Sequence, residues 1–179
     1  MGLLEGYRFA GVAAVRDGGD PSGLALAASR LASADPARYA AVLPSGEPLF
    51  RKGAYGGFLG EGIASVEEGF RLIERNARAG ATQIKVLATG LNSLDRAGET
   101  GSMQFAEGEF ARLAGRAREL GLPLMVHANG PLGYLPAHLE GTLEHGFWNA
   151  PRDLDRLKAA GALWTPTCEA WAALSGHPG

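Results

Sequence analysis

This sequence of 179 residues has little of what marks a secreted, membrane-bound or nucleic-acid-binding protein. It contains one cysteine, Cys168, so an internal disulfide is excluded. No apolar stretch approaches the roughly 20 residues that a membrane-spanning helix needs, and the first residues do not resemble a signal peptide. The net charge of −2 and the lack of a Lys/Arg cluster argue against nucleic acid and anionic membranes as partners. We therefore expect a cytoplasmic protein that binds neither nucleic acid nor membrane.

Lysine is also scarce, because only Lys52, Lys85 and Lys158 occur and arginine supplies nearly all of the positive charge. Lys85 lies inside an apolar run at 84–88, where a β-strand is expected. A lysine is almost never fully buried without a partner. The position of Lys85 therefore needs an explanation.

The rest of the sequence alternates between strand-like and helix-like patterns. Ser65, with Glu68 three residues later, is typical of a helix start, and Gly80 and Gly121 are typical of helix ends. The expected strands are 12–16, 39–43, 83–88, 122–127, 142–145 and 162–165. The expected helices are 3–9, 21–34, 65–79, 107–120, 134–140 and 151–160. Such alternation is typical of βαβ units and a parallel sheet.

This alternation predicts an α/β fold, namely an incomplete (β/α)8 TIM-type barrel with about six parallel strands. A complete barrel has eight strands and usually about 250 residues. A chain of 179 residues is long enough for one domain with a hydrophobic core, and it contains no linker or low-complexity tract. We therefore expect a single partial barrel domain over 1–179 that lacks the first and last strands.

Three of the expected strands end in a polar residue that is followed closely by a glycine. Lys85 lies in the strand before Gly90, His127 ends the next strand, and His145 ends the strand after that. The carboxyl ends of parallel barrel strands are where barrel enzymes gather their chemistry. Neutral imidazole is the commonest metal ligand among side chains. These three residues therefore predict a metal-dependent hydrolase.

The role of Lys85 has three possible interpretations. Its stem can pack in the strand layer while the ammonium reaches solvent or a carboxylate. Its amine can act as a Schiff-base nucleophile, because desolvation lowers the pKa of a lysine. Finally, a neutral amine can react with carbon dioxide to give a carbamate, an anionic ligand that bridges two metal ions. The Schiff-base interpretation leaves His127 and His145 without a joint role, whereas the carbamate gives all three residues one.

Four segments resemble the strand motifs of the amidohydrolase superfamily, most closely its imidazolonepropionase-like and prolidase-like branch. They are GVAAVRDGG at 11–19, GATQIKV at 80–86, GLPLMVHA at 121–128 and LEHG at 143–146. The resemblance covers about residues 3–171. It implies a (β/α)8 barrel with one or two divalent metals, often zinc. Lys85 would be the carboxylated lysine that bridges the ions, and His127 and His145 would bind the second ion.

The resemblance also implies a reaction. Metal-activated hydroxide would attack a carbonyl and cleave a carbon–nitrogen bond, amide-like or in a cyclic amide, in a small molecule or dipeptide. The family's first strand carries a His-x-His pair and its eighth an aspartate, and neither has a counterpart here. Asp17 lies in a turn, and Asp153 and Asp155 lie on an expected helix, so none of them replaces the missing ligands. We expect weak metal binding by this chain alone.

Two other interpretations remain open beside the hydrolase. The chain can be an inactive barrel fragment that needs a complementary chain or forms a homo-oligomer, because an open barrel leaves two unpaired strand edges. It can instead be a Schiff-base lyase that uses Lys85.

Candidate substrate-binding residues lie in a long loop expected over 45–62. Arg51 can meet a substrate carboxylate with two parallel hydrogen bonds, and Tyr55 lies nearby in the same loop. Asn129 can support the site by hydrogen bonding. Cys168 lacks an adjacent base and is expected to border the site rather than to react. His138 and His177 are expected at the surface.

Overall fold

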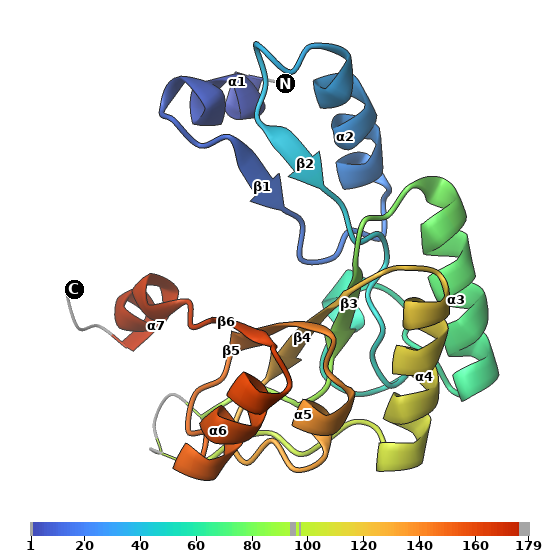
Figure 1. The fold of residues 1–179 in the computed structure, drawn as a ribbon, viewed down its shortest axis with the longest axis vertical. Coiled ribbons are helices and arrows are strands. Elements are labelled where there is room, and N and C mark those ends of the chain that lie inside the picture. The colour runs from blue at the N-terminus through green and yellow to red at the C-terminus, as the bar shows by residue number, and fades with distance from the viewer. Residues whose placement is uncertain (1, 94–95, 97, 176–179) are drawn as a thin grey trace.

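The chain folds into parallel strands that alternate with helices, as Figure 1 shows for the computed structural model, which describes residues 2–93, 96 and 98–175. Within these residues the strands are β1 (Ala14–Arg16), β2 (Ala41–Leu43), β3 (Ile84–Leu87), β4 (Leu124–Ala128), β5 (Gly141–His145) and β6 (Leu163–Thr165). The α-helices are α1 (Gly2–Phe9), α2 (Leu24–Ala34), α3 (Val66–Ala79), α4 (Glu107–Glu119), α5 (Leu135–His138), α6 (Pro151–Ala159) and α7 (Cys168–Ser175). The expected α/β fold with about six parallel strands is confirmed.

The strands form two parallel sheets in sequence order. β1 pairs with β2, while β3, β4, β5 and β6 form a four-stranded sheet. In the larger sheet His127 pairs in register with Leu87 on one side and with Glu144 on the other. His145 pairs with Ala128. This register brings the ends of β3, β4 and β5 together, as the sequence predicts.

The two sheets are connected by a segment that we expected to be loop. After β2 the chain turns at Pro44, and Leu49 then forms a parallel bridge with Val86 of β3. The Leu49 amide donates to the carbonyl of Lys85 at 2.8 Å, and the Leu87 amide donates to the carbonyl of Leu49 at 2.8 Å. Part of the expected loop therefore runs parallel to β3 and pairs with it.

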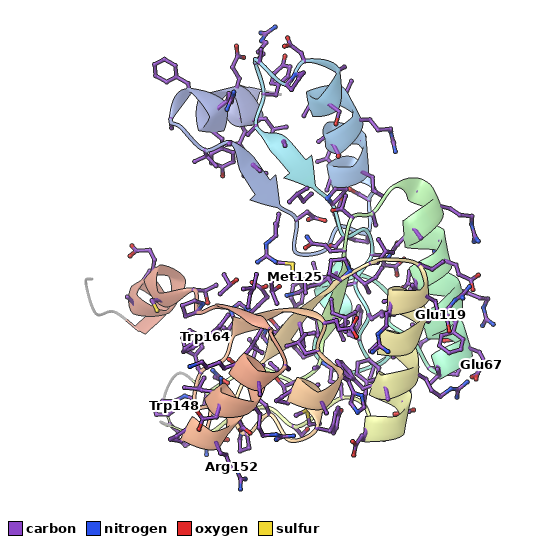
Figure 2. The ribbon with its side chains drawn as sticks, in the orientation of Figure 1. Glu67, Glu119, Met125, Trp148, Arg152 and Trp164 are labelled. Carbon is purple, nitrogen blue, oxygen red and sulfur yellow. The ribbon has the colours of Figure 1, made fainter. Side chains whose placement is uncertain are left out.

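Alternate residues of the larger sheet point to opposite faces. One face carries Ile84, Val86, Leu124, Val126 and Leu143, which belong to the main hydrophobic core. This core also includes apolar side chains of α3 and α4, which lie over that face of the sheet in Figure 1. The other face carries Lys85, Leu87, Met125, His127, Thr142 and Glu144. Figure 2 shows Met125 on the side of the sheet away from α4.

Local signals in the sequence explain where α3 begins and ends. Ser65 caps its start, because its Oγ accepts a hydrogen bond from the Glu68 amide at 3.2 Å. Glu68 in turn accepts from the Ala64 amide at 2.7 Å, so the acid and the serine satisfy free amides together. Gly80 adopts a φ of 97°, a left-handed conformation that ends the helix.

Two elements were not expected from the sequence, a short 3-10 helix (Gly57–Leu59) and α7. Helix α7 follows β6 directly, with Thr167 just before it. None of the helices in the described part of the chain is both long and apolar enough to cross a membrane.

Candidate metal centre

The sheet brings Lys85, His127 and His145 to one place. Lys85 and His127 lie on the face of the sheet opposite the helices, and His145 ends β5 beside them. The rings of His127 and His145 meet edge to face, with 4.8 Å between their centres and an angle of 71°. Burial lowers the pKa of both histidines, and the charge of the nearby Lys85 lowers it further.

Lys85 is buried, with 6% of its surface exposed. Burial lowers the pKa of its amine to about 8, because a low-dielectric environment disfavours the ammonium. Glu144 opposes this shift by attracting the cation, and Arg16 adds to it by repulsion. At pH 7 Lys85 is still mostly an ammonium, but its neutral fraction is far larger than that of an ordinary lysine, and carboxylation requires the neutral form.

His127 is neutral at physiological pH. Burial, followed by repulsion from His145 and Lys85, lowers its pKa to about 3. Its Nε2 lies 3.4 Å from the carbonyl oxygen of Gly90, and a carbonyl only accepts hydrogen bonds. This contact favours the tautomer that carries hydrogen on Nε2 and a free lone pair on Nδ1. The ring of Tyr55 packs beside it, with 5.4 Å between the ring centres.

His145 is held in an unusual backbone conformation, with a φ of 70°. Its carbonyl accepts a hydrogen bond of 2.9 Å from Nε1 of Trp164 on β6. Its Nδ1 lies 2.8 Å from Oγ1 of Thr167. Burial and the nearby Lys85 lower the pKa of the imidazole. Contacts from β6 and the residues after it therefore fix both the backbone and the ring of His145.

A buried ion pair that we did not expect lies beside these three residues. Arg16 of β1 reaches Glu144 of β5 at 3.0 Å and also donates to the hydroxyls of Thr142 at 2.8 Å and Thr165 at 3.2 Å. The Glu144 side chain is 4% exposed and that of Arg16 is 28% exposed. A signal was present in the sequence, because Glu144 and Thr142 alternate with buried Leu143. That alternation does not identify the partner of Glu144, which lies 128 residues away.

The two predicted substrate-binding residues lie at different distances from this centre. Tyr55 lies against His127, and Gln104 holds the backbone there by donating to the Tyr55 carbonyl at 2.9 Å. Burial raises the pKa of the Tyr55 hydroxyl. Arg51 instead forms an ion pair of 2.6 Å with Glu109 and donates to the carbonyl of Gln104 at 3.3 Å. Its role in substrate binding stays a prediction.

The remaining candidates also have defined positions. Asn129 is buried, and its side-chain oxygen accepts a hydrogen bond of 3.0 Å from the Phe147 amide. The ring of Phe147 is stacked on that of His145, with centres 6.3 Å apart. His138 lies 3.3 Å from Glu107 on the helical side, Cys168 is exposed, and His177 lies outside the described residues.

The protonation states of the donors at this centre suit a divalent cation, but the donors are few. Two neutral imidazoles and a lysine that is readily deprotonated carry lone pairs at physiological pH. Within the described residues no group of three His, Cys, Asp or Glu side chains is arranged to hold a metal. A site with Lys85 as its third ligand is therefore the arrangement that these residues offer.

The fold is that of part of the TIM barrel of amidohydrolases, which confirms the expected incomplete barrel. A Xaa-Pro dipeptidase with bound methionine is 20% identical, with a TM-score of 0.76 over 88% of this chain and 43% of its own. A prolidase complexed with N-methylphosphonate-L-proline is 22% identical, with a TM-score of 0.73 over 98% of this chain and 48% of its own. Ochratoxinase from A. niger is 20% identical, with a TM-score of 0.67 over 92% of this chain and 46% of its own.

These structures are members of the amidohydrolase superfamily, so the resemblance seen in the sequence is confirmed at the level of the fold. The chain spans less than half the length of each of the three. A scan against protein-family models finds no match, and a search of curated proteins finds none either.

Proposed function

We propose that this chain supplies the central part of a metal-dependent hydrolase that cleaves carbon–nitrogen bonds. The observation that carries the proposal is the meeting of three lone-pair donors on neighbouring strands: His127 and His145 near the ends of β4 and β5, and Lys85 on the face of β3 that also carries His127. The rings of His127 and His145 lie 4.8 Å apart, and Lys85 is close enough to lower the pKa of both. Strand ends of a barrel are where such sites are built.

The donors that would hold the ion are Lys85, His127 and His145, and zinc suits their nitrogen ligands. A bound divalent ion would polarise a substrate carbonyl and activate water. Burial keeps both imidazoles unprotonated above pH 7, so no proton competes for their lone pairs. Gly90 contacts Nε2 of His127 and Thr167 contacts Nδ1 of His145, so the other nitrogen of each ring would be the one to hold an ion.

Lys85 is proposed to act as a carbamate. Its neutral amine attacks carbon dioxide and a carbon–nitrogen bond forms. One proton of the nitrogen then passes to water, so that an anionic carbamate replaces a potential cation. A pKa of about 8 makes this reaction accessible at neutral pH, whereas an ordinary lysine is almost fully protonated there. Arg16, which already repels the ammonium of Lys85, would attract the carbamate instead.

The proposed substrates are dipeptides or small molecules with an amide-like bond. Proteins of the same fold include a dipeptidase, a prolidase and an ochratoxinase, which supports this class without selecting one compound. Tyr55, beside His127, is the candidate to contact substrate next to the ion. For Arg51 to contact a substrate carboxylate, its guanidinium would have to share or leave Glu109. The cytoplasm is the proposed location of the protein.

Metal analysis tests the proposal. Protein purified in bicarbonate and equilibrated with zinc should retain about one ion per chain or less after gel filtration, because only three of the family's ligands are present. His127→Ala should abolish the retained metal. His138→Ala is the matched control, since His138 lies beside Glu107 away from the centre, and it should retain as much as the wild type. Equal retention by all three proteins would contradict the proposal.

The low pKa of Lys85 also suits a Schiff-base lyase, so the two enzyme classes need a direct comparison. Borohydride with a carbonyl compound such as pyruvate traps a Schiff base as a stable adduct on the lysine. We expect no adduct on Lys85, and bicarbonate-dependent addition of carbon dioxide in mass spectra recorded under native conditions. A borohydride-stable adduct at Lys85 would favour the lyase.

A complementary chain or a second copy is the remaining proposed partner. Both β1 and β6 have one strand neighbour among the described strands. Sedimentation of the purified chain at several concentrations would show whether it associates with itself.

A further inference from the structure

Thr167, which follows β6, contacts a histidine of the candidate metal centre. Its Oγ1 is 2.8 Å from Nδ1 of His145, within the range of a good hydrogen bond. Thr167 is in neither β6 nor α7 but connects them, 22 residues after His145. The hydroxyl is therefore brought to the imidazole by the tertiary fold and not by local sequence.

The backbone of Thr167 is strained in a way that calls for a reason. Its φ is 50°, in the left-handed region that β-branched residues rarely adopt. Such a conformation is unfavourable and tends to persist where the surrounding structure requires it, often at functional sites. His145, its partner, also has a positive φ, of 70°. Both ends of this hydrogen bond are thus held in uncommon backbone conformations.

The other contacts of His145 leave one ring nitrogen for a ligand. The carbonyl of His145 accepts from Trp164, and Phe147 stacks on the ring. Since Nδ1 is occupied by the threonine hydroxyl, Nε2 is the nitrogen left to bind a cation. A neutral imidazole can bind through Nε2 only if its hydrogen is on Nδ1. A hydroxyl that accepts this hydrogen would select the required tautomer.

We propose that Thr167 is a positioning residue that accepts the Nδ1 hydrogen of His145 and so keeps the lone pair on Nε2 for the metal ion. This inference rests on the proposed function for its purpose, although the tautomer itself can be measured without metal. Partners of this kind orient a ligating histidine, and their loss typically weakens metal binding about 10- to 100-fold. Thr167 would hold His145 as the Gly90 carbonyl holds His127, through the opposite ring nitrogen.

The test replaces Thr167 by valine, which keeps the β-branched shape and removes the hydroxyl. Long-range proton–nitrogen NMR correlations distinguish the two neutral tautomers, and the His145 signals are assigned by their loss in His145→Gln. In metal-free wild-type protein we expect hydrogen on Nδ1 of His145, and in Thr167→Val a shift toward hydrogen on Nε2. Thr167→Ser, which restores the hydroxyl, should return the wild-type pattern.

A matched control is Thr82→Val, because the Thr82 hydroxyl donates to the Pro44 carbonyl at 3.3 Å, at the start of β3. This variant should leave the His145 tautomer unchanged. Zinc affinity, measured by competition with a chromogenic chelator, should fall about 10- to 100-fold in Thr167→Val and recover in Thr167→Ser.

The outcomes separate the inference from the proposed function. Hydrogen on Nε2 of His145 in the wild type, or the same tautomer in wild type and Thr167→Val, would overturn the role of Thr167. If the tautomer changes as expected but the wild type retains no zinc, the positioning role stands and the metal-dependent function fails. If zinc binds equally to wild type and Thr167→Val, the metal site stands and the positioning role is overturned.

Discussion

The candidate centre contains one residue, Lys85, whose burial costs the folded chain stability. Lys85 is almost fully buried among other charged groups, and its pKa of about 8 lies below its ordinary value of 10.5. That difference means that folding disfavours the ammonium, relative to the unfolded chain, by about 3 kcal/mol. A residue kept at such a cost is expected where its chemistry is used, because stability and activity often oppose each other.

Replacing this lysine should therefore stabilise the protein. Lys85→Met keeps the length of the side chain and should raise the free energy of unfolding by up to about 3 kcal/mol at pH 7. The unfolded lysine binds its proton up to pH 10.5, whereas the folded one releases it near pH 8. The gain from Lys85→Met should thus be largest below pH 8 and shrink to nothing as the pH rises through 10.5.

Urea unfolding at pH 7 and pH 10, in buffer free of carbon dioxide, measures this effect. Lys52→Met is the control, because Lys52 is exposed, and it should change the free energy of unfolding by less than about 0.5 kcal/mol at either pH. A Lys85→Met protein that is less stable than the wild type at pH 7 would show that the lysine cation is well compensated in the fold.

At the scale of elements, the strands that carry the centre are predictable where the signal is local. The ends of α3 follow from Ser65 and Gly80, and the strands β3, β4 and β5 follow from apolar runs between helices. Helix α7 was not predicted, because its Ala-rich sequence has no clear polar face. The bridge between Leu49 and Val86 was not predicted either, because periodicity does not identify the pairing partner of a single residue.

The candidate site shows the same division. The placement of His127 and His145 could be predicted, since residues at the ends of successive parallel strands must meet. Lys85 shares the face of His127 because it alternates with Ile84 and Val86 along β3. The contacts around these residues could not be predicted, because they join distant parts of the sequence. Thr167 contacts His145 from 22 residues away, and Arg16 contacts Glu144 from 128 residues away. Sequence patterns thus predict which side chains gather, and only the structure shows what orients them.

Strand β5 begins at a glycine for which no other residue can substitute without movement of the backbone. Gly141 has a φ of 147°, and a Cβ added there would lie 2.0 Å from the carbonyl oxygen of Leu124 on β4. Gly161, just before β6, also has a positive φ, of 68°, but a Cβ there would meet nothing within 4 Å. A substitution at Gly161 therefore meets backbone strain alone, whereas one at Gly141 meets backbone strain and a steric clash.

Gly141→Ala should lower the free energy of unfolding by about 3 kcal/mol or more, because β4 and β5 must separate to admit the methyl group. Gly161→Ala should cost about 1–2 kcal/mol, the price of a left-handed alanine alone. Chemical denaturation of both variants gives the comparison. A similar loss of unfolding free energy in the two proteins would mean that β4 and β5 can move apart at Gly141 at little energetic cost.

At the scale of the whole molecule, the part around β1 and β2 has an apolar cluster of its own. Leu4, Ala32 and Val42 form a small apolar cluster there, separate from the main core around β3–β6. Figure 1 shows α1, α2, β1 and β2 projecting from the larger sheet and its helices. Large apolar side chains of this part are exposed, among them Leu3 and Phe9. Arg16 links the two parts through β5 and β6, and Gln83 and Arg30 also link them by donating to the carbonyls of Leu43 and Ala79.

Arg16 should matter more than its surface position suggests. Removing it leaves Glu144, which is 4% exposed, without its ion-pair partner, and an uncompensated buried charge costs about 3–5 kcal/mol. Lys85 can offset part of this cost, because loss of Arg16 removes a repulsion that lowers the Lys85 pKa and leaves the attraction of Glu144. We therefore expect Arg16→Ala to lower the free energy of unfolding by about 3 kcal/mol.

Two comparisons make this prediction specific. Arg38 forms an exposed ion pair with Glu5 at 3.0 Å, and Arg38→Ala should cost much less than Arg16→Ala because water screens an exposed pair. Arg16→Ala combined with Glu144→Gln should recover part of the loss, since the second change removes the stranded charge. Hydrogen exchange should show faster opening of β1 and β2 amides in Arg16→Ala, with β3–β5 less affected. Equal costs for Arg16→Ala and Arg38→Ala would instead mean that the smaller sheet is held by the backbone link through Leu49, without help from the buried pair.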